Sequence, residues 1–170
     1  MDAHHIKSSV AGVVEYLKQN PSAAQSKDSA AVAVLEDGLR CRAHAPNGDV
    51  VRTDMPTAVG GEGTAPSPGW LLRAALANCD ATMIAMRAAV EGISLTKLEV
   101  TVDSDSDDRG LVGVDDAAPA GPLRVRVRVR ATSDASPDRF RKVVDWAAQH
   151  SPVGDAIRRS IPTALTIEGS

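Results

Sequence analysis

Cys79 is the residue whose type and setting most directly suggest chemistry, because it lies inside a long apolar segment with helical spacing. A redox nucleophile at this position needs a thiolate, a nearby cation and some access to solvent. The alternative is an inert buried thiol, since free cysteine is among the most buried residue types. Cys79 lies about three turns inside the expected helix, too far from its N-terminus for the helix dipole to help. An arginine from elsewhere in the fold would therefore have to stabilise the thiolate.

The other residues that can do chemistry each have an ordinary structural explanation. Cys41 lies on the apolar face of an early strand, although a role as partner of Cys79 stays open. Two isolated cysteines form neither a disulfide framework nor a zinc pattern, and we expect no metal and no cofactor. Ser151 precedes Pro152, which is typical of a helix N-cap. His150 is adjacent to Ser151 in sequence, which is poor geometry for activating a serine.

Four helices are expected to position these residues, and they are assigned from apolar spacing and from their start and stop signals. The longest runs from Ser67-Pro68 to about Glu91 and stops at Gly92. It is so apolar around its circumference that we expect it to be buried on several sides, with its narrow polar stripe spaced by seven at Arg73, Asp80 and Arg87. The other expected helices cover residues 8–18, 136–150 and 151–159.

Alternating patterns predict the strands. An Asp-Gly turn divides strands at 31–36 and 39–45, and a short strand follows at 49–53. Two longer strands, at 98–103 and 123–130, carry acids and arginines respectively on their outer rows. We therefore predict that these two are antiparallel neighbours with opposite charges facing each other. A last strand is expected at 163–167, so that the fold class is α+β.

Composition limits the class of protein. The chain has 170 residues, a net charge of −3 and only 2% aromatic residues. These values fit one domain with an aliphatic core and argue against binding to nucleic acid. The absence of a long charge-free apolar stretch predicts no membrane partner, and two free cysteines with no signal-peptide pattern favour the cytoplasm.

The segment GGEGTAPSPGWLLRAALANCDATMIAMRAAVEGISLTKLEV resembles the signature region of the OsmC family. That family has a Gly-rich loop, a proline that begins a helix, a Leu/Ala run ending in cysteine, and a Gly-Ile stop before a strand. The later segments RGLVGV and HSPVGDAIRRSIPTALTI match landmarks of a longer OsmC-like branch. The resemblance covers about residues 51–167. It implies an OsmC-like domain over residues 30–170, preceded by an N-terminal helix and connection over 1–29, in a single-domain chain.

The resemblance also implies a fold, an activity and site residues. OsmC-like proteins form intertwined homodimers in which antiparallel sheets wrap around long central helices. The better-known members, OsmC and the organic hydroperoxide resistance (Ohr) proteins, are thiol peroxidases of the peroxide stress response. Cys79 matches their attacking cysteine and Arg52 best matches the arginine that holds the thiolate. Ser151 stands in place of their second cysteine and Gly69 in place of their glutamate, for which Glu62 is a possible substitute from the loop.

We therefore expect a thiol-dependent oxidoreductase that reduces a small organic hydroperoxide with one cysteine and an external thiol reductant. A non-enzymatic homodimer that binds a small hydrophobic ligand in its interface groove is the alternative. A purely structural dimer with an inert Cys79 is the third possibility.

Overall fold

The computed structural model describes residues 3–169 of the chain. These residues form two compact units. One unit comprises residues 7–74, and the other comprises residues 75–169 together with residues 3–6. Helix α1 (Ala3–Gln19) is longer at its N-terminus than the predicted segment 8–18, and none of its residues is buried.

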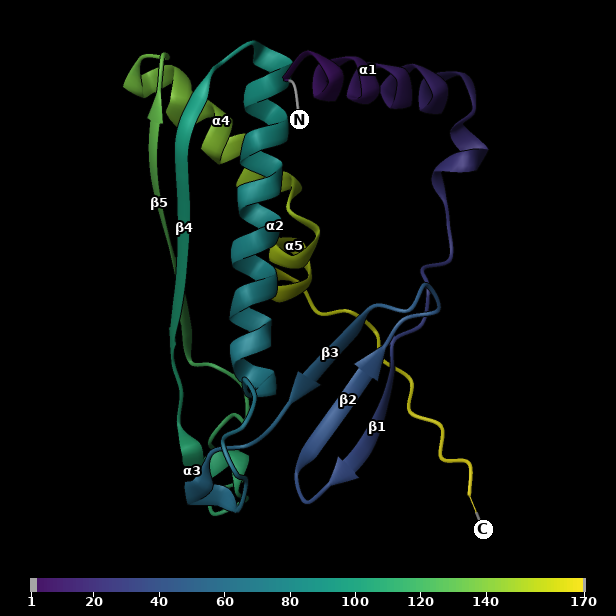
Figure 1. Cartoon of the computed structure of the whole chain (residues 1–170), viewed down its shortest axis with the longest axis vertical. Coiled ribbons are helices and arrows are strands. Elements are labelled where there is room, and N and C mark those ends of the chain that lie inside the picture. Colours follow the sequence, from purple (N-terminus) through teal and green to yellow (C-terminus); the bar gives the residue numbers. More distant parts are fainter. Residues whose placement is uncertain (1–2, 170) are drawn as a thin grey trace. The chain divides into compact units, whose positions relative to one another are not determined.

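The unit of residues 7–74 contains a three-stranded antiparallel sheet in the order β1-β2-β3. Its strands are β1 (Val32–Asp37), β2 (Arg40–His44) and β3 (Val50–Thr53), as predicted within two residues at each end. Gly38 forms the β1–β2 turn with a φ of 53°, a left-handed conformation that glycine adopts without steric cost. The predicted Asp-Gly hairpin is therefore confirmed (Figure 1).

Asp54, directly after β3, organises the loop that precedes the long helix. Its side chain is 1% exposed and accepts hydrogen bonds from the backbone N–H groups of Met55, Glu62 and Thr64. The hydroxyl of Thr64 donates a further bond of 2.9 Å. These hydrogen bonds lower the pKa of Asp54, and the bond from the Thr64 backbone N–H has the largest effect. Burial of the carboxyl group acts in the opposite direction and raises the pKa. One carboxylate thus fixes a glycine-rich segment that has few side-chain contacts of its own.

The long helix α2 (Pro68–Glu91) has the predicted bounds because local signals specify both of its ends. The Ser67 hydroxyl accepts a bond from the Trp70 N–H at the start. At the end, Gly92 is left-handed with a φ of 68°, and the Ile93 N–H donates to the Ala88 carbonyl. That pattern is a Schellman motif, which satisfies carbonyls the helix would otherwise leave unpaired.

Two long antiparallel strands, β4 (Leu95–Asp105) and β5 (Arg124–Ser133), form the second sheet. Their register places Asp103 opposite Arg126 and Glu99 opposite Arg130. Arg126 forms ion pairs with Asp103 and with Asp105, the latter at 2.6 Å. The predicted pairing of acidic and arginine rows is confirmed.

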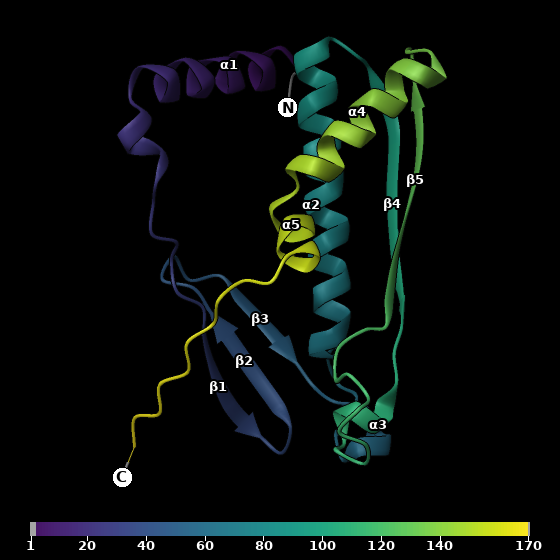
Figure 2. The same cartoon turned by 180° about the vertical axis from the view of Figure 1, so that it is seen from behind.

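Helices α4 (Pro137–His150) and α5 (Pro152–Arg158) follow, and a short helix, α3 (Asp108–Leu111), lies in the acidic loop between the strands. Figures 1 and 2 show α2 between the β4–β5 hairpin on one side and α5 on the other. The core of this unit joins α2, the hairpin and α4. Its fully buried members are Ile84, Ala88, Ile93, Val143 and Ala147.

The strand predicted at 163–167 is wrong, because residues 159–169 adopt no regular structure. Leu165 and Ile167 are 88% and 87% exposed. A strand needs a neighbour to satisfy its backbone, and this segment pairs with none within the described residues.

The predicted α+β class with antiparallel sheets is confirmed, while the intertwined homodimer stays a prediction. Across residues 3–169, no helix is both long enough and apolar enough to cross a membrane.

Candidate functional site

Cys79 and Ser151 lie in direct contact although they are 72 residues apart in sequence. The Ser151 hydroxyl donates a hydrogen bond of 3.3 Å to the Cys79 Sγ. Ser151 is fully buried and is the N-cap of α5, where its Oγ also accepts a 3.1 Å bond from the Gly154 N–H. A directed chain thus runs from a backbone amide through a hydroxyl to sulfur, and each bond polarises the next.

Cys79 contributes to this contact from α2, where it is half-buried. The fully covered residues of α2 recur mostly every fourth position along one stripe: Leu76, Asp80, Ile84 and Ala88, with Ala89 beside it. Cys79 lies next to this stripe and is itself half-buried. The prediction that α2 is buried on several sides is not met within one chain, since Trp70 and Leu72 remain 50% and 40% exposed.

His150 does not act on Ser151. Its imidazole ring stacks on Trp146 with ring centroids 4.0 Å apart, and its Nδ1 lies 2.7 Å from the Trp146 carbonyl oxygen. The geometry agrees with the expectation that Ser151 is not a hydrolase nucleophile.

Arg52, the predicted helper of Cys79, lies on β3 opposite Arg42. Its Nε is 3.3 Å from Glu36, which also binds Arg42 at 3.1 Å. The Arg52 side chain is 61% exposed and therefore free to change its partner. Because Arg52 belongs to the unit of residues 7–74 and Cys79 to the other unit, their pairing stays a prediction.

The possible substitutes for the missing family residues also lie in the unit of residues 7–74. Glu62 accepts a 2.7 Å ion pair from Arg40, and its carboxylate is 65% exposed. Cys41 is half-buried on β2, opposite Leu35 and Thr53. At Gly69 an added side chain would meet only the Ser67 hydroxyl at 4.0 Å, so there is room for a larger residue. The roles of Glu62 and Cys41 stay predictions.

The exposed environment predicted for Asp80 from the sequence is wrong. Its spacing of seven from Arg73 and Arg87 predicted a polar stripe, but Asp80 is only 7% exposed and lies on the buried stripe of α2. Arg73 and Arg87, on either side of it along the predicted polar stripe, are half-buried. The packing of α5 and β5 around Asp80, and not the spacing along the helix, decides its environment.

No cluster of three or more metal-binding side chains occurs among residues 3–169. The arrangement at Cys79 therefore consists of a half-accessible thiol, one hydroxyl donor and the apolar body of α2.

Comparison with solved structures shows the same fold in several proteins. An OsmC-like protein from Mycoplasma pneumoniae has 17% identity and a TM-score of 0.66, and the match covers 79% of this chain and 89% of that one. An organic hydroperoxide resistance protein OsmC from Legionella pneumophila has 24% identity and a TM-score of 0.60, with coverages of 79% and 91%. The organic hydroperoxide resistance protein OhrB of Bacillus subtilis has 19% identity, a TM-score of 0.51, and coverages of 78% and 91%.

No curated protein matches the sequence. A family model described as OsmC-like protein matches residues 61–166, which is more than half of the chain. The matched region contains α2 with Cys79, both strands of the second sheet, and Ser151 at the start of α5. The chain belongs to the OsmC family.

Proposed function

We propose that this protein is a one-cysteine thiol peroxidase that reduces small organic hydroperoxides with an external thiol. The observation that carries the proposal is the 3.3 Å contact between Cys79 and Ser151. This contact brings together the two positions that match the paired cysteines of the peroxidases, and Ser151 occupies the second of them. The names of the Legionella and Bacillus relatives, both organic hydroperoxide resistance proteins, support the same substrate class.

The reaction follows from the groups present. The Cys79 thiolate attacks the terminal peroxide oxygen, so that an S–O bond forms as the O–O bond breaks. The leaving alkoxide takes a proton and departs as an alcohol, and Cys79 becomes a sulfenic acid. An external thiol attacks the sulfenic sulfur with loss of water and forms a mixed disulfide. A second thiol then releases the Cys79 thiolate and an external disulfide.

Ser151 has a definite part in this scheme. Its hydroxyl cannot form a disulfide, so the internal resolving step of the two-cysteine peroxidases is replaced by the external thiol. The hydroxyl is instead positioned to donate to the sulfur before the reaction and to the sulfenate oxygen after it. Ser151 is fully buried, which shields this donor from competition with water.

The proposal includes a homodimer in which the Arg52 guanidinium approaches Cys79. Its positive charge would stabilise the negative charge of the Cys79 thiolate. The exposed position of Arg52 on β3 is compatible with such a role. The same dimer would cover the apolar side chains that α2 leaves exposed within one chain.

Trapping of the sulfenic acid tests the proposal. The protein is mixed with an alkyl hydroperoxide and a sulfenic-acid trap, and the adducts are located by mass spectrometry. We expect an adduct at Cys79 in the wild-type protein and peroxide loss that stops in Cys79→Ser. The matched control is Cys41→Ser, which removes the other half-buried thiol and should retain both signals.

The proposal fails if Cys79 gives no adduct, or if Cys79→Ser consumes peroxide as fast as the wild-type protein does. The variant Arg52→Ala should slow peroxide consumption by roughly tenfold or more, as expected for loss of one electrostatic partner. Its control is Arg42→Ala, which removes the other arginine bound to Glu36.

A further inference from the structure

Asp80 is a buried polar group that the peroxidase reaction does not use. It is 7% exposed, and its Oδ1 has no hydrogen-bond partner within the described part of the chain. A buried acceptor without a partner costs free energy, and such groups usually have a partner in native proteins. The Oδ1 is therefore available to accept a hydrogen bond from a bound molecule.

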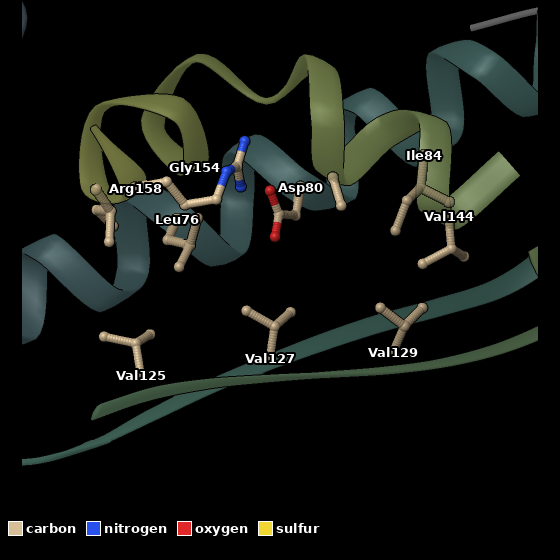
Figure 3. Close-up of a pocket in the computed structure, with 11 residues that line it drawn as sticks. Leu76, Asp80, Ile84, Val125, Val127, Val129, Val144, Gly154 and Arg158 are labelled. Atoms are coloured by element: carbon tan, nitrogen blue, oxygen red, sulfur yellow. The ribbon is translucent and has the colours of Figure 1, made fainter.

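Asp80 faces a cavity of about 350 Å³ between α2, α5 and the inner face of β5. Figure 3 shows its carboxylate directed into this space, opposite Val127. The remaining walls are mainly aliphatic, and they include Leu76, Ile84, Val125, Val129 and Val144. The volume lies within the range of small-molecule sites and is more than twice the roughly 150 Å³ of a cavity that holds benzene.

The cavity has a second polar group and a route of entry. The guanidinium of Arg158, on α5, is drawn beside the Asp80 carboxylate in the middle of the cavity wall (Figure 3). Gly154 allows this position, because a Cβ there would lie 2.9 Å from the Arg158 Nη1. Val127 and Ile157 line the cavity and are 45% and 37% exposed, so a ligand can enter beside them.

We propose that this cavity binds an uncharged amphiphile with a hydroxyl head group and an aliphatic body. A hydroxyl can donate to the Asp80 Oδ1 and accept from the Arg158 guanidinium at the same time. The valines and leucine would enclose the aliphatic part, whose burial away from water favours binding. The site uses neither Cys79 nor Ser151, so it stands independently of the proposed peroxidase activity.

Charged ligands fit these groups less well. A carboxylate head would place a second negative group beside Asp80, and an ammonium head would lie beside the Arg158 guanidinium. A metal ion lacks ligands here, because Asp80 belongs to no metal-binding cluster within the described residues. The pair of Asp80 and Arg158 therefore selects for a neutral head that both donates and accepts.

Calorimetric titration with 1-octanol, octanoate and octylamine tests the proposal on the full-length protein. We expect 1-octanol to bind most tightly, both to the wild-type protein and to Cys79→Ser. Asp80→Leu should weaken 1-octanol binding at least about tenfold, the usual loss for one hydrogen bond to a charged group. Asp80→Asn keeps an acceptor at the same place and should retain most of the affinity.

Two further variants separate the site from general effects on folding. Val127→Phe should fill the cavity and abolish binding, whereas Val112→Phe adds the same ring at a 58% exposed position outside it and should not. Asp80→Leu should also unfold at an equal or higher temperature, because it removes an unsatisfied buried carboxyl. The proposal is overturned if 1-octanol does not bind, if Asp80→Leu binds it unchanged, or if octylamine binds more tightly than 1-octanol.

Discussion

At the scale of single residues, the Cys79–Ser151 pair differs from a pair of cysteines by one atom, an oxygen in place of a sulfur. The serine at position 151 holds an oxygen 3.3 Å from the Cys79 sulfur, and the local backbone keeps it there as the N-cap of α5. A serine in this setting preserves the geometry of a cysteine pair while removing its ability to form a disulfide.

Ser151→Cys should accordingly restore an internal disulfide. The two sulfurs would start near the 3.3 Å separation of the present oxygen and sulfur, and a small adjustment gives the length of about 2.05 Å. On mild oxidation, we expect two of the three thiols of this variant to disappear in a thiol titration. Peptide mapping should show Cys79 joined to the introduced residue.

Ser136→Cys is the matched control, because Ser136 is the N-cap of α4 and also precedes a proline. The 14 residues of α4 place it about 21 Å from Ser151. This variant should keep its three thiols under the same oxidation. Loss of two thiols here, or their retention in Ser151→Cys, would contradict the position assigned to Cys79.

At the scale of elements, the sequence predicted best what local signals specify. The ends of α2 follow from Ser67, Pro68 and Gly92, and the β4–β5 pairing follows from the opposite charges of facing rows. Tertiary packing decides the rest. The burial of Asp80 depends on how α2 meets the β5 strand, and the contact of Cys79 with Ser151 joins distant segments that only the family resemblance connected.

The loop between β3 and α2 should open at low pH because Asp54 holds it. The pKa of Asp54 is lowered in the folded state, so its stabilising effect is complete above the unfolded pKa of about 3.9. The effect is lost as the pH falls through the folded pKa. The Glu62 and Thr64 amides should therefore lose protection against hydrogen exchange in this acidic range, measured relative to an unstructured peptide at the same pH, since both amides donate to Asp54.

Asp54→Asn should exchange rapidly at these two amides already at neutral pH and should unfold several degrees lower than the wild-type protein. Asp28→Asn, at an exposed position of the same unit, should retain the wild-type behaviour. An unchanged exchange rate in Asp54→Asn would show that the glycine-rich segment is held by other contacts.

At the scale of the whole molecule, a single chain leaves apolar side chains exposed to solvent and the outer edges of its described sheets without a neighbouring strand. Both sheets of the described chain are small and end in unpaired edges, one with three strands and the other with two. Such edges invite pairing with another chain, and a two-stranded sheet is marginal alone. Trp70 and Leu72 on α2 are exposed as well. A second copy of the chain would supply both the strands and the apolar cover.

We therefore predict that the protein sediments at twice the 17.7 kDa mass of the chain. Leu72→Glu places a charge on the exposed part of α2 and should shift the sedimenting mass to that of one chain at micromolar concentration, because an unpaired charge at an apolar interface is strongly unfavourable. Leu39→Glu is the control, since Leu39 is equally exposed, at 42% against 40%, but lies in the β1–β2 turn. If both variants remain dimeric, the exposed part of α2 is not the interface. If the wild-type protein is itself a monomer, Arg52 can reach Cys79 only within its own chain. If Leu72→Glu does dissociate the dimer, its peroxidase assay shows whether the partner completes the site, because a site completed by the partner loses activity with the dimer and a site complete within one chain does not.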